Sequence, residues 1–434
     1  MKINIRSWIM PLVVVAVLLG AFATRGGDTA LPALIMMAVM ACLCGVAWLL
    51  PVSQTPALGR RPEVLWVAGA AVLLAAVLAA QPLLLTLTHT SSGTSGLYDP
   101  SRAALEYLKL AGVFCAFALA FRLTMDDESG RNLLDTLIVA GGLWAAVAIF
   151  LNVMDPNNIY GVPKTAGAGR LQGAFSSPNS AGTLFAAISV MAFGRLLSRF
   201  WSSRARQVFE RIDPVFLAVW LISLTALVLT MSRMAVVSGA IATLALAAIL
   251  CWRRAPMKWL LIGTAAGAVV MIGLLVTPML AIVQRVHDLN SDGHVRTVIL
   301  QEHLKVAMHQ FWLGSGFGSF TAVNSSILTS ANYPYLAPIG AMHNVYLQWL
   351  EEVGIVGLTC LVLLNLAILV PIYGAARRRQ TMGSRLWIVL AAYLVFLIHG
   401  LTDYAFQEPA LELFTALLLG AAFGVATNSG RRPG

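Results

Sequence analysis

Long apolar runs recur along the whole sequence, and they constrain the fold more than any other feature. A helix needs about 20 apolar residues to cross a bilayer, and twelve runs of roughly this length are present. Only 11% of the residues are charged, against about 25% in soluble domains. The sequence therefore predicts an all-α polytopic membrane protein. The predicted spans are residues 8–24, 29–50, 64–81, 103–123, 132–152, 179–197, 215–231, 234–252, 259–283, 343–369, 386–401 and 409–427.

The basic residues are unevenly distributed between the loops. With the N-terminus in the cytoplasm, twenty of the 29 Lys and Arg residues fall in cytoplasmic segments and nine in external ones. Cytoplasmic loops normally carry this excess, so both termini are predicted to be cytoplasmic. The same bias explains the net charge of +10 without a nucleic-acid partner. The first run also resembles a signal peptide, with a candidate site at Ala21-Phe22-Ala23, so its removal is the alternative to a retained helix.

Three predicted external segments are long, residues 82–102, 153–178 and 284–342. The third lies between the ninth and tenth spans. Within it, residues 293–313 mix polar and apolar side chains at helical spacing, which predicts an amphipathic helix near the external surface. No internal repeat is evident, so we expect a single membrane domain over residues 1–434 with a helical periplasmic cap in the third segment.

Two external arginines lie where a charge is costly. Arg233 stands between two spans with almost no loop, which favours either a functional group facing the protein interior or an interface anchor. Arg170 precedes a predicted helix start at which Ser177 and Asn179 can act as caps. A helix N-terminus beside an arginine is suited to an anion, and the alternative is ordinary capping.

The amphipathic segment carries a third cation. Arg296 opens it, and His303 lies seven residues later on nearly the same helix face, although a solvated face is the alternative. The following sequence GSGFGSF, residues 314–320 with Gly316 at its centre, is similar to a phosphate-binding loop. It lacks the strand–loop–helix context of such a motif, so we predict a tight chain reversal there.

A polar stripe begins the tenth span. His343 and Asn344 stand at its external end, and Gln348 and Glu351 continue the stripe into the helix. Such a stripe must face protein or water rather than lipid. A neutral imidazole can accept a proton, so His343 is a candidate general base. The alternative is a histidine that only hydrogen-bonds the helix cap.

These positions resemble those of the O-antigen ligase and polymerase family of bacterial inner-membrane glycan enzymes. The resemblance rests on the Arg–Gly–Phe and Pro–Asn residues within 170–179, the pair Ser232 and Arg233, and the stretch 296–357. That stretch runs from Arg296 through GSGFGSF and HNVYLQWLEEVGIVG. Twelve spans with one large external loop in the last third most resemble the ligase branch. The resemblance implies a GT-C-like membrane fold.

The resemblance also implies a function. A glycosyltransferase of this kind moves O-antigen glycan from undecaprenyl diphosphate to a sugar hydroxyl of lipid A–core, at the periplasmic face of a Gram-negative inner membrane. Such an enzyme is metal-independent, requires no cofactor and inverts the anomeric centre. The alternative is a polymerase that joins lipid-linked repeat units, and a more distant one is a lipid or anion transporter or flippase. The expected site comprises His343 as catalytic base, Arg170, Arg233 and Arg296 as diphosphate ligands, and Asn344, His303 and Gly316 as supporting residues.

No metal site is evident in the sequence. The five cysteines lie in or beside apolar runs without a CxxC spacing, and histidines and acidic residues do not cluster at metal-ligand spacing. We therefore predict that the protein requires no metal.

Overall fold

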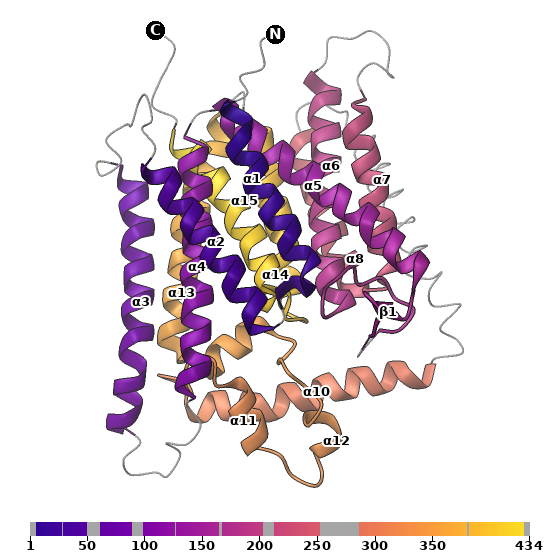
Figure 1. Ribbon diagram of the computed structural model, residues 1–434. Helices are drawn as coiled ribbons and strands as arrows, with labels where there is room; N and C mark the ends of the chain where they lie inside the picture. The colour runs from indigo at the N-terminus through magenta and orange to yellow at the C-terminus, as the bar shows by residue number, and fades with distance from the viewer. Residues whose placement is uncertain are drawn as a thin grey trace.

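The computed structural model shows a bundle of helices with a smaller helical cap at one end (Figure 1). It describes residues 6–27, 29–49, 61–88, 99–125, 127–164, 167–202, 212–251, 286–379 and 382–428. The bundle helices are α1 (Arg6–Ala23), α2 (Ala30–Leu49), α3 (Pro62–Thr88), α4 (Pro100–Leu123), α5 (Asp127–Met154), α6 (Pro178–Ser202), α7 (Pro214–Leu229), α8 (Arg233–Cys251), α13 (Val345–Arg378), α14 (Gly383–His399) and α15 (Pro409–Thr427).

These helices confirm the predicted fold class. Eight of them are long and apolar enough to cross a membrane, and α1, α7 and α14 contain shorter apolar helices. Together they match eleven of the predicted spans. The twelfth, residues 259–283, lies outside the described residues. Helix α1 begins and α15 ends at the end of the bundle opposite the cap (Figure 1).

Helix α15 forms the centre of the bundle. Its side chains are buried along nearly the whole length, with Glu412 in the first turn as a half-buried exception. Glycines allow α4 to approach closely, because a Cβ at Gly420 would meet the Phe117 carbonyl oxygen at 2.3 Å. Small residues permit such close packing between membrane helices. The central helix thus fixes the position of α4 relative to the α15 N-terminus, where the cavity described below lies.

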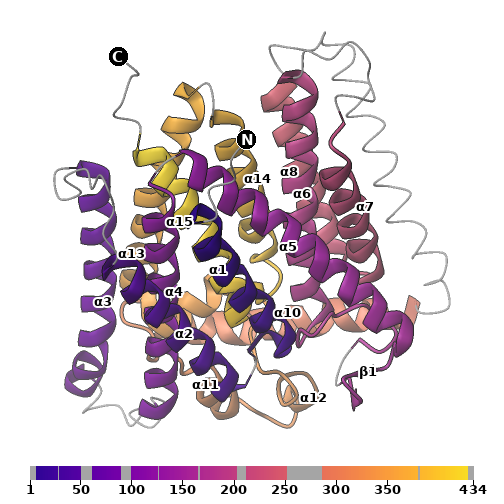
Figure 2. The same cartoon turned by 45° about the horizontal axis from the view of Figure 1, so that its top comes forward.

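The cap contains α10 (Val286–His309), α11 (Phe320–Ser326) and α12 (Tyr333–Leu336). Helix α10 lies across the end of the bundle (Figures 1 and 2), and it corresponds to the predicted amphipathic helix. A separate small core joins the cap to the start of α13. Its buried members are Ile299, Ala307, Phe320, Leu336, Met342 and Leu347.

Helix α13 is interrupted at Gly354, whose φ of 65° and ψ of −176° are not helical. The Gly-rich loop pairs with this break through the main chain. Ser315 and Gly316 donate their N–H groups to the carbonyls of Glu351 and Glu352, each at 2.8 Å. Non-helical backbone at membrane depth requires such partners. The GSGFGSF sequence forms bends and turns between α10 and α11, and it docks the cap on α13.

Candidate active site

A cavity of about 760 Å³ lies between the cap and the bundle. Three residues predicted for the site, Arg170, Arg296 and His343, are among those that line it. They come from the loop before α6, from α10 and from the residues just before α13. The structure thus brings together side chains that are far apart in the sequence.

Arg170 is held by its neighbours in a fixed orientation. Its Nε donates to the Thr230 carbonyl oxygen at 2.9 Å, and Nη2 donates to Asn179 Oδ1 at 3.3 Å. The Lys164 ammonium donates to the main-chain carbonyl of Arg170 at 2.7 Å. The predicted helix start is also present, since Ser177 Oγ accepts the N–H of Asn179 at 3.1 Å. The guanidinium is therefore positioned at the N-terminus of α6, where an anion is favoured.

Arg296 approaches the same region from the cap. Its side chain is exposed, and Nη1 donates to the carbonyl oxygen of Thr402 at 3.3 Å. Thr402 belongs to the loop between α14 and α15, which also carries Asp403. This contact joins the cap helix to the loop that surrounds His343.

His343 has a strained backbone. Its φ of 57° places a non-glycine residue in the left-handed region, a conformation that is rare and often marks a functional position. Val345 N–H, two residues later, donates to the Gly400 carbonyl at 2.9 Å. The His343 ring packs edge-on against Tyr404 with centroids 4.9 Å apart. The histidine is thus fixed between the start of α13 and the loop after α14.

Asp403 is the negative partner of His343. Its Oδ2 lies 3.8 Å from His343 Nδ1 and accepts a hydrogen bond from Asn179 Nδ2 at 2.5 Å. Burial alone would raise the pKa of Asp403, but the neighbouring His343 and His399 and the N–H of Tyr404 lower it below its ordinary value. Asp403 is therefore a carboxylate at neutral pH. Because Nδ1 of His343 is turned toward it and buried, Nε2 is the nitrogen that remains for a substrate.

Asn179 connects the two halves of this arrangement. Its side-chain oxygen accepts from Arg170 and its nitrogen donates to Asp403, which also fixes the orientation of the amide. A continuous set of polar contacts therefore runs from Arg170 through Asn179 and Asp403 to His343.

The remaining predicted residues do not line the cavity. Arg233 begins α8 and is exposed, three residues after the Thr230 that holds Arg170. Asn344 caps α13 by accepting the Leu347 N–H at 3.0 Å, and it donates to the Leu401 carbonyl. The roles of Arg233 and Asn344 in substrate binding stay predictions.

His303 is fully buried away from the cavity. Its Nδ1 lies 2.7 Å from Glu351 Oε2, and Nε2 lies 3.3 Å from Asn324 Oδ1. Gly316 likewise contacts α13 rather than the cavity, through the hydrogen bond to Glu352. Both residues join the cap to α13, so they support the site from behind.

Several cavity residues were not predicted. Tyr404 lies in the short loop after α14, while Glu106 and Lys109 lie on α4 and Glu412 on α15. Asp403, beside Tyr404, contacts the site through His343 and Asn179. A charged residue in an apolar span is itself a signal of function, and that signal was available for Glu106, Lys109 and Glu412. The loop residues carried no comparable signal, because polar side chains are ordinary in loops.

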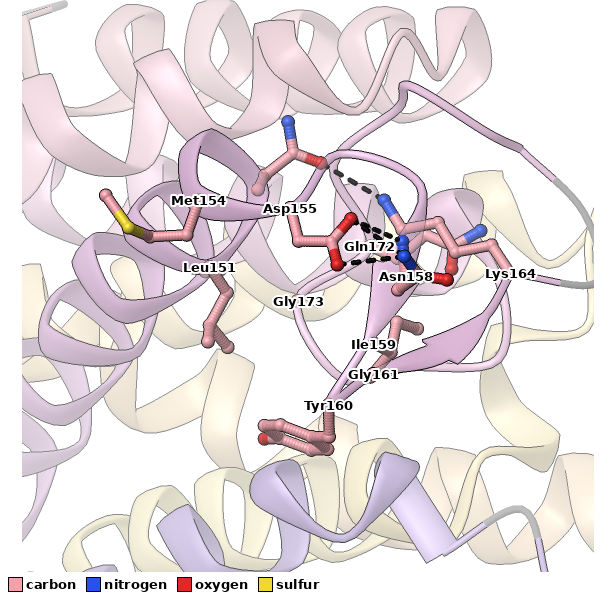
Figure 3. Close-up of a pocket in the computed structure, with 12 residues that line it drawn as sticks. Leu151, Met154, Asp155, Asn158, Ile159, Tyr160, Gly161, Lys164, Gln172 and Gly173 are labelled. Carbon is pink, nitrogen blue, oxygen red and sulfur yellow. Dashed lines mark hydrogen bonds between the residues drawn. The ribbon is translucent and has the colours of Figure 1, made fainter.

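A second, smaller cavity of about 140 Å³ lies at the end of α5, beside a hairpin of β1 (Asn158–Ile159) and β2 (Val162–Pro163) (Figure 3). Lys164 donates there to Asn152 Oδ1 at 3.2 Å and to the Pro156 carbonyl at 2.7 Å. Together with its bond to the carbonyl of Arg170, these contacts occupy the ammonium group. The residues around this cavity therefore help to hold the main chain at Arg170 in position.

The fold and the site define a class: multi-pass membrane proteins that gather arginines and a histidine in one cavity beside a cap. Residues 217–362 match the family model described as O-antigen ligase. The match supports the resemblance to the O-antigen ligase and polymerase family, whose members are glycosyl-transferring enzymes, and it includes Arg233, Arg296, His303 and His343. No curated protein matches the chain.

Proposed function

We propose that this protein transfers O-antigen glycan from undecaprenyl diphosphate to a sugar hydroxyl of lipid A–core, at the periplasmic face of the bacterial inner membrane. The observation that carries the proposal is the convergence of Arg170, Arg296 and His343 on one cavity. An anionic leaving group and a hydroxyl nucleophile require such a combination.

In this mechanism, Arg170 and Arg296 bind the diphosphate of the donor. Nε2 of His343 accepts the proton of the acceptor hydroxyl while its oxygen attacks the anomeric carbon. The bond from that carbon to the diphosphate oxygen breaks, and undecaprenyl diphosphate leaves with the electron pair. Attack from the face opposite the leaving group inverts the anomeric centre. Asp403 stabilises the imidazolium that forms on His343.

Reconstitution tests the ligase function. The protein is placed in liposomes with the lipid-linked glycan and lipid A–core, in parallel reactions with and without EDTA. Transfer to lipid A–core is the expected result, and retention of the rate in EDTA supports a metal-independent reaction. A separate reaction contains two lipid-linked repeat units and no lipid A–core. If the glycan lengthens there and no transfer to lipid A–core occurs, the protein is a polymerase. No product with either acceptor contradicts both functions.

A transporter is the more distant alternative, and the interrupted helix α13 bears on it. Transporters use helix breaks to present unpaired backbone groups to an ion or substrate. Here the Gly-rich loop donates main-chain hydrogen bonds to the residues before Gly354. The turn that precedes this loop accepts those after it, from Ile355 to Phe311 and from Val356 to Trp312. The break is therefore occupied by protein, which favours an enzyme.

Arg296→Lys tests whether the guanidinium matters beyond its charge. Lysine cannot form two parallel N–H bonds to a phosphate, so we expect the KM for the donor to rise about tenfold, corresponding to about 1.4 kcal/mol. Initial rates at varied donor concentration measure it. Lys305→Arg is the matched control, because Lys305 lies on the same helix and is 70% exposed. An unchanged donor KM in Arg296→Lys contradicts diphosphate binding by this residue.

The same assay decides the role of Arg233, which lies outside the cavity lining. If Arg233 also binds the diphosphate, Arg233→Lys raises the donor KM as Arg296→Lys does. If it is an interface anchor, the donor KM stays at the wild-type value, because lysine anchors as well as arginine does.

Asp403→Asn tests the partner of His343. We expect kcat to fall by at least about a hundredfold with the donor KM unchanged, because the imidazolium loses its counter-charge. The lowered pKa of Asp403 also makes the free energy of unfolding depend on pH. The stabilisation from the ionised Asp403 is present above the unfolded-state pKa and is lost as the pH falls through the folded-state pKa. In Asp403→Asn, the free energy of unfolding should therefore fall less steeply as the pH is lowered. Glu302→Gln on the cap should keep both the wild-type kcat and the wild-type pH dependence of stability.

A further inference from the structure

The cavity has two chemically different parts. The first contains Arg170, Arg296 and His343. The second, which we name the carboxylate wall, is formed by Glu106 on α4, Glu352 and Trp349 on α13, and Glu412 on α15. Lys109 also lies in this wall, where its ammonium pairs with Glu106 at 2.7 Å.

Close contacts hold the carboxylate wall together. Gly318 of the Gly-rich loop packs against Glu106, since a Cβ there would lie 3.2 Å from Glu106 Cγ. Its N–H donates to Glu352 Oε2 at 2.9 Å. Phe317, the preceding residue, packs against Trp349 with ring centroids 5.5 Å apart. The Gly-rich loop therefore holds the α4 and α13 residues of the wall in place.

One acceptor in this wall lacks a donor. Glu412 Oε2 is buried, and the described part of the chain gives it no hydrogen-bond partner. Buried polar atoms in folded proteins are normally paired, so this oxygen is open to a partner from outside the chain. Glu412 also lines the cavity, where a bound molecule can reach it.

The lining selects the kind of molecule. The carboxylate wall offers three carboxyl groups and one ammonium and contains none of the arginines of the first part, so the diphosphate binds beside those arginines. Sugar hydroxyls donate hydrogen bonds to carboxylates, and the half-buried ring of Trp349 offers an apolar face to a pyranose. Mixed apolar and polar linings of this kind are typical of small-ligand sites.

Hydrogen bonds tie the carboxylate wall to His343. Gln348 Nε2 donates to Glu352 Oε1 at 3.0 Å, and its Oε1 accepts the N–H of Met342 at 3.2 Å. Met342 directly precedes His343. A saccharide bound to the wall is therefore held at a defined position relative to the base.

We propose that the carboxylate wall is the subsite for the acceptor saccharide, with Glu412 and Trp349 as specificity-determining residues. This assignment rests on the proposed glycosyl transfer. It places the acceptor sugar on α4, α13 and α15, and the donor diphosphate between α6 and the cap.

The test separates the two substrates kinetically. Glu412→Gln and Trp349→Leu are compared with wild type in liposomes, with rough lipopolysaccharide as acceptor in one arm and undecaprenyl-diphosphate-linked repeat units in the other. The acceptor KM is expected to rise about tenfold, as for the loss of one buried hydrogen bond, while the donor KM stays constant. The arm in which the shift occurs identifies the source of the saccharide.

Glu128→Gln is the matched control, because Glu128 is exposed at the opposite end of the bundle. An unchanged acceptor KM, or a rise in the donor KM instead, overturns the subsite. If wild-type protein transfers nothing in either arm, the proposed function has failed. Binding of rough lipopolysaccharide and of the lipid-linked repeat units to nanodisc-embedded protein then tests the subsite directly. Weaker binding of one saccharide by Glu412→Gln supports it, and equal binding by variant and wild type of both contradicts it.

Discussion

His343→Ala should abolish glycan transfer while the protein remains folded. A positioned general base contributes about 10²–10⁴-fold to a rate, and alanine offers no atom that can accept the acceptor proton. The left-handed φ of residue 343 is adopted more often by histidine than by alanine, so we expect a small loss of stability in a variant that still folds. Single-turnover transfer with saturating donor and acceptor measures the loss, and thermal unfolding in detergent measures folding.

His309→Ala provides the control, because His309 is an exposed histidine at the end of α10. It should retain wild-type rates. Donor binding by His343→Ala should also be unchanged, since the diphosphate is bound by Arg170 and Arg296. Full transfer activity in His343→Ala would sink the general-base role, and loss of donor binding would show that His343 contacts the diphosphate instead.

Gly354→Ala should have the largest effect on folding. With φ near 65° and ψ near 180°, residue 354 occupies a region that is essentially restricted to glycine. A Cβ there would lie 2.3 Å from the carbonyl oxygen of Trp312, and that oxygen is part of the main chain of the docked loop. We expect destabilisation of at least about 3 kcal/mol, seen as a large fall in Tm or in the yield of monodisperse protein.

Gly374→Ala is the matched control on the same helix. Its backbone is helical, and the nearest atom to a new Cβ is 3.2 Å away at the flexible end of Arg378. Alanine is favoured over glycine in a helix by about 1 kcal/mol, so the Tm of this variant should equal or exceed that of wild type. A Gly354→Ala protein as stable as Gly374→Ala would show that the break in α13 is not required for the fold.

The sequence predicted the spans well because length and hydropathy are local properties. The break in α13 was not predicted, since VGIVG continues an apolar helical pattern without a gap. Only its partner decides the conformation there: the carbonyls of Phe311 and Trp312 replace the helical acceptors of Ile355 and Val356. Main-chain pairing between segments 40 residues apart leaves no trace in local periodicity.

The candidate site was predictable where a charge lies in an apolar context. His343 stood out for that reason, whereas Arg170 was predicted from the helix start that follows it and Arg296 from the amphipathic segment. The structure places all three at one cavity, but not Arg233, which had the most apolar context. His303 shared a helical face with Arg296 in the sequence, but seven residues amount to about 10 Å along a helix. Arg296 therefore reaches the cavity, while His303, farther along the helix, is buried against Glu351. Asp403 was missed because its role depends on tertiary proximity to His343.

The docking of the Gly-rich loop on α13 has a consequence for exchanging parts between related enzymes. The boundary between cap and bundle is crossed by main-chain hydrogen bonds that any sequence can form, but only in one register. A chimaera that replaces residues 286–342 alone would pair the Gly-rich loop of one protein with the interrupted helix α13 of another. A transplant that extends through Gly357 carries both partners of that pairing together. The natural modular unit is therefore the cap with the first turns of α13, and the base His343 moves with it.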